Sequence, residues 1–176
     1  MPSRLFLAAA GICSAVLLAA TAQPAFAAAG DTTTTFALGG STLSVSVQPT
    51  ASLTDGASGA TSVSGQLGVV RVTDLRGGVA AWSARATSTT FTNGGTGAGL
   101  TESTGVSYDS GALTTTGTIV IAPKGAKSLS SSPTEVAGPT AVIGNNTAQW
   151  NPTVTVTLPS NSLAGTYSGT ISSSVL

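Results

Sequence analysis

The chain carries very little ionic or reactive chemistry. Its 176 residues include no histidine, a single cysteine, six Lys or Arg and six Asp or Glu. The lack of histidine excludes Ser-His-Asp and Cys-His nucleophile systems and zinc sites built from imidazole. The sparse, balanced charge provides neither the cations that nucleic acid requires nor a polybasic patch for an anionic membrane. We therefore expect no nucleic-acid partner.

No arrangement of carboxylates in the sequence predicts catalysis. The acidic residues Asp74, Glu102, Asp109 and Glu135 lie in expected turns or loops, and their spacing pairs none of them. Asp109-Ser110-Gly111 is typical of a turn, since a calcium loop needs several carboxylates in quick succession. The glycine motifs that bind nucleotide phosphates do not occur. The sequence thus predicts neither an enzyme nor a metal or cofactor site.

Residues 1–27 have the three parts of a secretory signal peptide. Arg4 makes the start positive, Leu5 to Ala20 form an apolar run, and Pro24 precedes the small-x-small site Ala25-Phe26-Ala27. The apolar run is shorter than the ~20 residues that span a bilayer. We expect cleavage after this site and an extracellular or cell-wall location.

Cleavage would leave residues 28–176 as one domain without a transmembrane segment. The single cysteine, Cys13, lies in the signal peptide, so the mature chain would form no disulfide. Apolar and hydroxyl residues alternate with period two in several segments, as in half-buried strands. The clearest segments are 42–48, 117–123, 152–159 and 166–175. No mature segment shows helical periodicity.

The spacing of these strands predicts an all-β fold. Turn signals separate them at Asp55-Gly56, Asn93-Gly94-Gly95, Gly138-Pro139 and Gly144-Asn145-Asn146. We predict an antiparallel β-sandwich with immunoglobulin-like topology, and a closed barrel as the alternative. The polar segments Thr92–Ser107 and Lys124–Thr140 are expected to be long loops, where recognition usually occurs.

Charge is concentrated in the stretch VVRVTDLRGGVAAWSA, residues 69–84. We predict a hairpin between a strand over 67–73 and one beginning near Ala80, with Gly77 supplying positive φ. Asp74 would cap the turn, and Arg76 would pair with it or bind backbone carbonyls. Asp74, Arg76 and Gly77 would then form a structural lock. In the alternative interpretation, Arg71 or Arg76 contacts a ligand.

The two tryptophans are the other conspicuous residues. Trp82 has small neighbours, Ala81, Ala84 and Ala86, which favour a place in the core. Trp150 follows a polar run and precedes Asn151-Pro152, at the edge of an expected loop. It is either a core residue or an exposed ring that stacks on a sugar. The candidate ligand-binding residues are Trp150, Trp82, Arg76 and Arg71.

Several motifs resemble the WxL-like cell-wall-binding domain family, in its actinobacterial form. They are Val72-Thr73-Asp74-Leu75-Arg76-Gly77 followed by Trp82-Ser83-Ala84, then Ala148-Gln149-Trp150 with the strand 154–159, and the closing segment 164–171. The resemblance spans about Leu43 to Val175. The third position of Trp-x-Leu is Ala84 in the first copy and Pro152 in the second, so both motifs are altered.

The resemblance implies a WxL-like β-sandwich over residues 28–176 that attaches without covalent bonds to the peptidoglycan of Gram-positive cells. We therefore expect a secreted, non-catalytic surface protein that binds peptidoglycan or another wall glycan. The alternative is a structural protein that binds another envelope protein by strand addition. Burial of both tryptophans would remove the aromatic platform for glycan. An exposed edge over Thr166–Ser174 would favour strand addition.

Overall fold

The computed structural model describes residues 35–37, 39, 42–57, 59–94 and 102–176. The predicted signal peptide lies outside the described residues. The chain divides into two units, residues 1–37 and 38–176, and the fold described below is that of the second. Within the described ranges no helix is long and apolar enough to cross a membrane.

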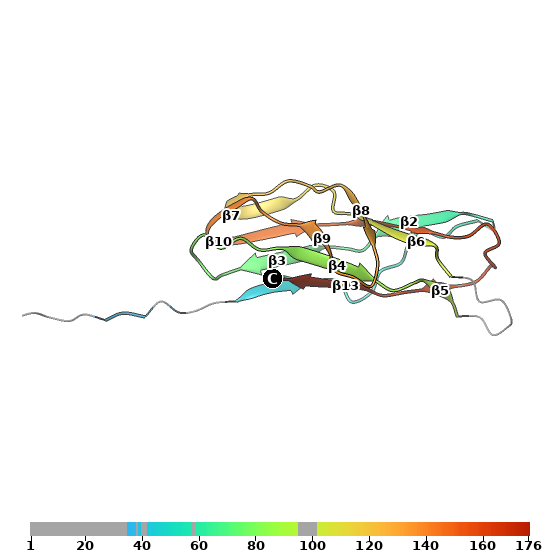
Figure 1. Ribbon diagram of the computed structural model, residues 1–176, viewed down its shortest axis with the longest axis horizontal. Helices are drawn as coiled ribbons and strands as arrows, with labels where there is room; N and C mark the ends of the chain where they lie inside the picture. The colour runs from blue at the N-terminus through green and yellow to red at the C-terminus, as the bar shows by residue number, and fades with distance from the viewer. Residues whose placement is uncertain (1–34, 38, 40–41, 58, 95–101) are drawn as a thin grey trace, which may run out of the picture. The chain divides into compact units, whose positions relative to one another are not determined.

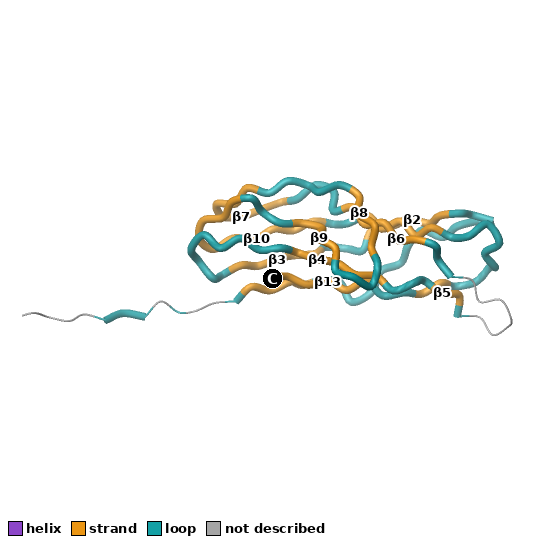
Figure 2. Tube along the Cα trace, viewed as in Figure 1, coloured by secondary structure: helices purple, strands orange, loops and turns teal. Residues whose placement is uncertain are grey.

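The described part of the second unit is built from strands, turns and loops, without a helix (Figure 2). Its strands are short because bulges and bends interrupt them. They are β1 (Leu43–Ser46), β2 (Ser62–Gln66), β3 (Val70–Asp74), β4 (Ala84–Ser88), β5 (Thr92–Asn93), β6 (Gly105–Asp109), β7 (Thr114–Val120), β8 (Ala126–Leu129), β9 (Thr134–Ala137), β10 (Ala141–Trp150), β11 (Thr153–Thr157), β12 (Tyr167–Ser168) and β13 (Ile171–Val175).

All strand pairs are antiparallel and form four hydrogen-bonded groups. Their orders are β1-β3-β10-β7, β2-β11-β6-β8, β13-β4-β9 and β12-β5. The first two groups share long strands, because β2 continues into β3, β6 into β7 and β10 into β11 (Figure 1). In the same way, β4 continues into β5 and β12 into β13, which joins the last two groups. The first two groups therefore form one layer and the last two groups form the other.

A bulge at Gly68 explains why β2 and β3 are separate strands. Trp150 pairs with Val70 and Thr153 pairs with Gln66, so the β2–β3 segment carries one residue more than the β10–β11 segment opposite. Gly68 has φ of 86°, the left-handed conformation that a bulge residue needs. The bulge bends the first layer and keeps the alternate side chains facing inward on both sides of the bend.

The core lies between the two layers. Val70 and Val72 of β3 and Val154 and Val156 of β11 are buried in one cluster with residues of β4 and β9 and with both tryptophans. Their alternation with exposed residues follows from the period of a strand with one buried face. The prediction of an antiparallel, sandwich-like all-β fold is confirmed.

The connectivity does not support the immunoglobulin-like part of that prediction. A constant-type immunoglobulin sheet places its first, second, fifth and fourth strands side by side. Here β1 is followed by the second continuous segment, β2–β3, and then by the sixth, β10–β11. The fifth segment, β8–β9, pairs at its two ends with β6 and β4 instead.

Three local predictions differ from the structure. The expected loop Lys124–Thr140 contains β8 and β9, whose short segments AKSL and TEVA alternate too weakly to be recognised. The expected loop Thr92–Ser107 includes β5 and the first residues of β6 at its two ends, and its residues 95–101 lie outside the described residues. The expected turn at Gly144-Asn145-Asn146 lies inside β10, where the register with β7 shifts. Gly144 has φ of 70°, so these turn-forming residues make a bulge rather than a turn.

Candidate functional site

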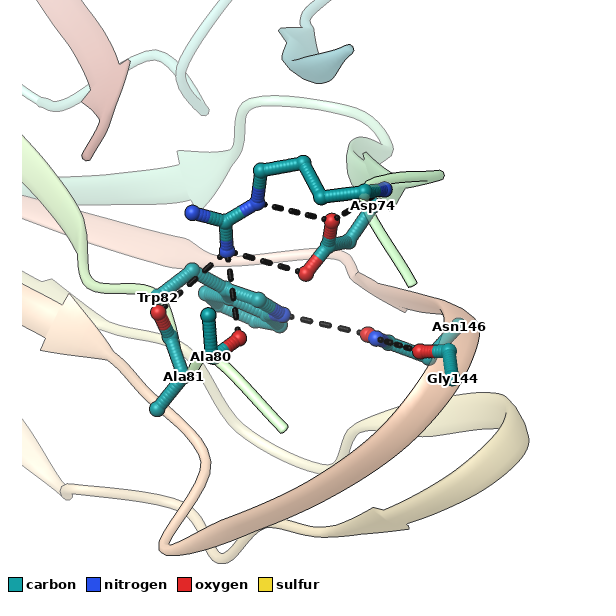
Figure 3. Close-up of polar contacts among 7 residues, drawn as sticks. Asp74, Ala80, Ala81, Trp82, Gly144 and Asn146 are labelled. Atoms are coloured by element: carbon teal, nitrogen blue, oxygen red, sulfur yellow. Dashed lines mark hydrogen bonds and ion pairs between the residues drawn. The ribbon is translucent and has the colours of Figure 1, made fainter. Parts of the chain in front are cut away.

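The predicted pairing of Asp74 with Arg76 is present at the end of β3 (Figure 3). Oδ1 of Asp74 accepts hydrogen bonds from Nε of Arg76 at 2.9 Å and from its backbone N–H at 3.0 Å. Oδ2 accepts a third bond from Nη2 at 3.0 Å. The same Nη2 donates to the carbonyls of Ala80 at 3.2 Å and Ala81 at 3.3 Å. Arg76 thus ties Asp74 to the chain that follows.

These contacts favour the charged forms of both side chains. Asp74 is only 1% exposed, and the hydrogen bond from Arg76 holds its pKa below the usual value although burial acts in the opposite direction. The hydrogen bond to Asp74 raises the pKa of Arg76. Through this pair and the two carbonyl bonds, Arg76 fixes the backbone between residues 74 and 81.

The predicted hairpin is a crossover. β3 pairs with β1 and β10, whereas β4 pairs with β13 and β9, so the segment between β3 and β4 passes from one layer to the other. Gly77 and Gly78 have φ of 67° and 69°, as expected for glycines in a tight path. A pair of glycines fits either a hairpin or a crossover. Which of the two forms is decided by the distant strands with which β3 and β4 pair. We call Asp74, Arg76 and Gly77 the crossover lock.

Trp82 is a core residue, as predicted. Its side chain is 3% exposed, and its indole Nε1 donates to Oδ1 of Asn146 at 3.1 Å (Figure 3). Asn146 in turn donates from Nδ2 to the Gly144 carbonyl at 3.2 Å. Asn146 lies directly opposite Asp74 in the β3–β10 register. The crossover lock and Trp82 therefore belong to one polar cluster under the crossover.

The interpretation of Trp150 as an exposed stacking residue was wrong. Trp150 is 3% exposed, and its Nε1 donates to the hydroxyl of Tyr108 at 2.8 Å. Burial raises the pKa of Tyr108 to about 12, so the phenol stays neutral beside the indole. The inward alternation of β10 continues to its last residue, and this places the ring in the core. Neither tryptophan provides a face for a sugar.

Arg71 has a different environment from Arg76. It lies on the exposed face of β3, in register with Ser46 of β1 and Gln149 of β10. Its side chain is therefore available to a ligand, whereas that of Arg76 is held within the crossover lock.

A cleft lined by hydroxyl groups was not predicted. It has a volume of about 510 Å³ and is formed by the segment after β4, the segment leading into β6 and the turn between β8 and β9. Val106 and Leu129, both buried, form its apolar floor. None of the described residues that line it is charged. We call it the hydroxyl cleft, after its lining residues Ser88, Thr89, Thr90, Ser103, Thr104, Ser130 and Ser131.

Three of these hydroxyls are oriented by backbone N–H groups. Thr89 Oγ1 accepts from Thr170 at 2.9 Å, Ser103 Oγ from Phe91 at 2.9 Å, and Ser130 Oγ from Ser132 at 3.1 Å. A hydroxyl that accepts one bond retains its own proton for donation. The cleft therefore offers fixed, uncharged donors and acceptors above an apolar floor. Such an arrangement suits a neutral ligand that carries hydroxyl groups of its own.

The carboxylates do not gather into a metal site. Among the described residues there is no group of three or more His, Cys, Asp or Glu side chains placed to hold an ion. Asp109 Oδ1 accepts the Gly111 N–H at 2.9 Å, and the predicted turn lies in the short irregular segment through which β6 continues into β7. Glu135 pairs with Lys124 at 2.7 Å, and this hydrogen bond lowers its pKa.

Comparisons of the chain with protein-family models, with curated proteins and with solved structures found no match.

Proposed function

We propose that the protein is a secreted, non-catalytic module of a bacterial cell envelope that binds a neutral wall glycan in the hydroxyl cleft. The glycan strand of peptidoglycan is the first candidate, because the sequence resembles WxL-like domains and begins with a predicted signal peptide. The observation that carries the proposal is the set of uncharged hydroxyls at residues 88–90, 103–104 and 130–131, of which Thr89, Ser103 and Ser130 are oriented by backbone N–H groups.

The size and chemistry of the hydroxyl cleft support this ligand class. Its volume of about 510 Å³ lies within the roughly 300–1,000 Å³ of typical small-molecule sites. A sugar ring has hydroxyls at its rim and C–H groups on its faces, and these match the hydroxyl walls and the floor of Val106 and Leu129. Recognition would then depend on hydrogen bonds and not on aromatic stacking.

The proposal changes the roles of the four candidate ligand-binding residues. Trp82 and Trp150 contribute to the core, and Arg76 contributes to the crossover lock. Arg71 is the one of the four whose side chain is exposed on a sheet face.

A sedimentation assay with insoluble Gram-positive cell walls tests the proposal. The double variant Thr90→Val, Ser131→Ala removes two hydroxyls of the cleft while nearly preserving volume. We expect it to bind at least about tenfold more weakly, since each lost hydrogen bond contributes about 1 kcal/mol. The matched control, Thr118→Val with Ser172→Ala, removes two exposed hydroxyls that do not line the cleft.

Two results would contradict glycan binding in the cleft. The parent protein could stay in the supernatant over a range of salt concentrations and wall preparations. Alternatively, the cleft variant could sediment with the walls as well as the parent and the control do.

A further inference from the structure

One side of the sandwich is bounded by two edge strands, β1 and β13. In the described part of the chain, β1 is hydrogen-bonded to β3 alone and β13 to β4 alone. The two edge strands lie near each other without a ladder between them. Each therefore presents backbone N–H and C=O groups to which a further strand can bond. An exposed edge at the C-terminal strand is the arrangement that favours strand addition.

An apolar groove of about 280 Å³ opens beside this edge. Its apolar walls come from Val47, Leu53, Leu67, Val70, Phe91 and Ile171, and none of the described lining residues is charged. Val47 is 48% exposed, so part of the apolar surface lies open to solvent. We call it the edge groove. An uncharged, extended segment with apolar side chains at alternate positions would fit it.

The chain itself contains such a segment before β1. Residues 32–38 read TTTTFAL and carry no charge. If this segment were extended, Phe36 and Leu38 would lie on one face, because alternate side chains of a strand point the same way. Phe36, a large apolar residue, is 83% exposed. The exposed ring and the uncharged groove have complementary chemistry.

We infer that the edge groove binds the Thr32–Leu38 segment of a second copy as an added strand beside β13. Phe36 enters the apolar groove, and the backbone of the segment bonds to the free edge of β13. Donor segment and acceptor groove are different surfaces, so each copy can give one strand and receive another. Such a head-to-tail contact builds rings or open chains rather than a closed symmetric dimer. The edge groove and the hydroxyl cleft have different lining residues, although Phe91 and Thr170 of the groove donate backbone bonds to Ser103 and Thr89 of the cleft.

The test is the oligomeric state of the secreted form, residues 28–176, measured by sedimentation over a concentration series. Phe36→Asp disables the donor, and Val47→Asp disables the acceptor. We expect the parent to form oligomers that grow with concentration and each variant alone to be monomeric. Val79→Asp is the matched control, because Val79 is 76% exposed and does not line the groove. It should assemble like the parent.

Mixing the two disabled variants gives a sharper result. Phe36→Asp retains an intact groove and Val47→Asp an intact donor segment, so the mixture should form dimers and nothing larger. Parent oligomers that persist in Phe36→Asp would overturn the inference. So would a parent that stays monomeric at all concentrations. If a Phe36→Trp monomer showed a buried, concentration-independent fluorescence, the groove would hold the chain's own segment, and the inference of a second copy would again be wrong.

Discussion

Polar side chains have opposite uses in the crossover lock and in the hydroxyl cleft. At the end of β3, Asp74 accepts three hydrogen bonds from Arg76, and the nearby Trp82 indole donates to Asn146. In the hydroxyl cleft, Thr89, Ser103 and Ser130 each accept one backbone bond and keep a proton to donate. The groups that attract notice in the sequence are occupied in holding the fold. The groups that can still donate hydrogen bonds are the less conspicuous serine and threonine hydroxyls of the hydroxyl cleft.

The largest effect is expected from Trp82→Ala. The substitution leaves a cavity in the core and removes the donor to Asn146, which is 2% exposed. We expect the free energy of unfolding to fall by about 3–5 kcal/mol, as for other large-to-small changes of aromatic core residues. Chemical denaturation measures it. Trp82→Phe restores most of the volume but not the donor, so it should recover part of the loss. Full stability of Trp82→Ala would contradict the role of Trp82 in the core.

Asp74→Asn should be the next most damaging change. Losing one partner of a buried ion pair costs about 3–5 kcal/mol. Because the Arg76 side chain is 32% exposed and can be rehydrated, we expect about 2 kcal/mol here. Asp55→Asn removes the same charge from an exposed position and should have little effect. Equal effects of the two substitutions would show that the crossover lock does not stabilise the fold.

The contribution of the crossover lock should also depend on pH in a defined direction. The pKa of Asp74 is lower in the folded protein, so its stabilisation is complete above the unfolded value of about 3.9. This stabilisation is lost as the pH falls from about 3.9 through the lower pKa that Asp74 has in the folded protein. The difference in unfolding free energy between the parent and Asp74→Asn should therefore be constant near neutral pH and shrink below about pH 4. A difference that grows with acidity would contradict the pairing.

Trp150→Phe tests whether this tryptophan packs or binds ligand. It retains a ring in the core but removes the bond to the Tyr108 hydroxyl, so we expect a loss of about 1–2 kcal/mol. Binding to cell walls should be unchanged once folding is confirmed by circular dichroism. A folded variant that no longer binds walls would show that Trp150 takes part in ligand binding.

Period-two alternation predicted the strands that have one clearly buried face. The predicted segments around β1, β7, β11 and β13 contain strands in the structure. The same rule failed for β8 and β9, where four-residue segments mix charged, hydroxyl and small side chains. It also could not reveal which strands pair, because pairing depends on contacts far apart in the chain. The crossover between layers was for that reason interpreted as a hairpin.

The crossover lock and the hydroxyl cleft also differ in whether local sequence was enough to predict them. The contact of Asp74 with Arg76 joins residues two apart, so local sequence was enough to predict it. The hydroxyl cleft combines three segments around residues 88–90, 103–104 and 130–131. Its residues belong to Ser/Thr runs that resemble many others in this chain. The pairing of β6 with β8, the Ser88–Ser130 backbone bond and the bonds between Phe91 and Ser103 bring them together.

The smallest effect on stability should come from the cleft variant Thr90→Val, Ser131→Ala. Both side chains are exposed, and substitutions at such positions usually change the unfolding free energy by less than about 0.5 kcal/mol. Changes in the core and in the hydroxyl cleft should therefore have opposite effects on stability and on binding. Denaturation and wall sedimentation on the same samples measure the two properties. Trp150→Phe should lose stability and keep binding, whereas the cleft variant should keep stability and lose binding. If the cleft variant lost stability as well, its hydroxyls would be structural, and the distinction between the two regions would not hold.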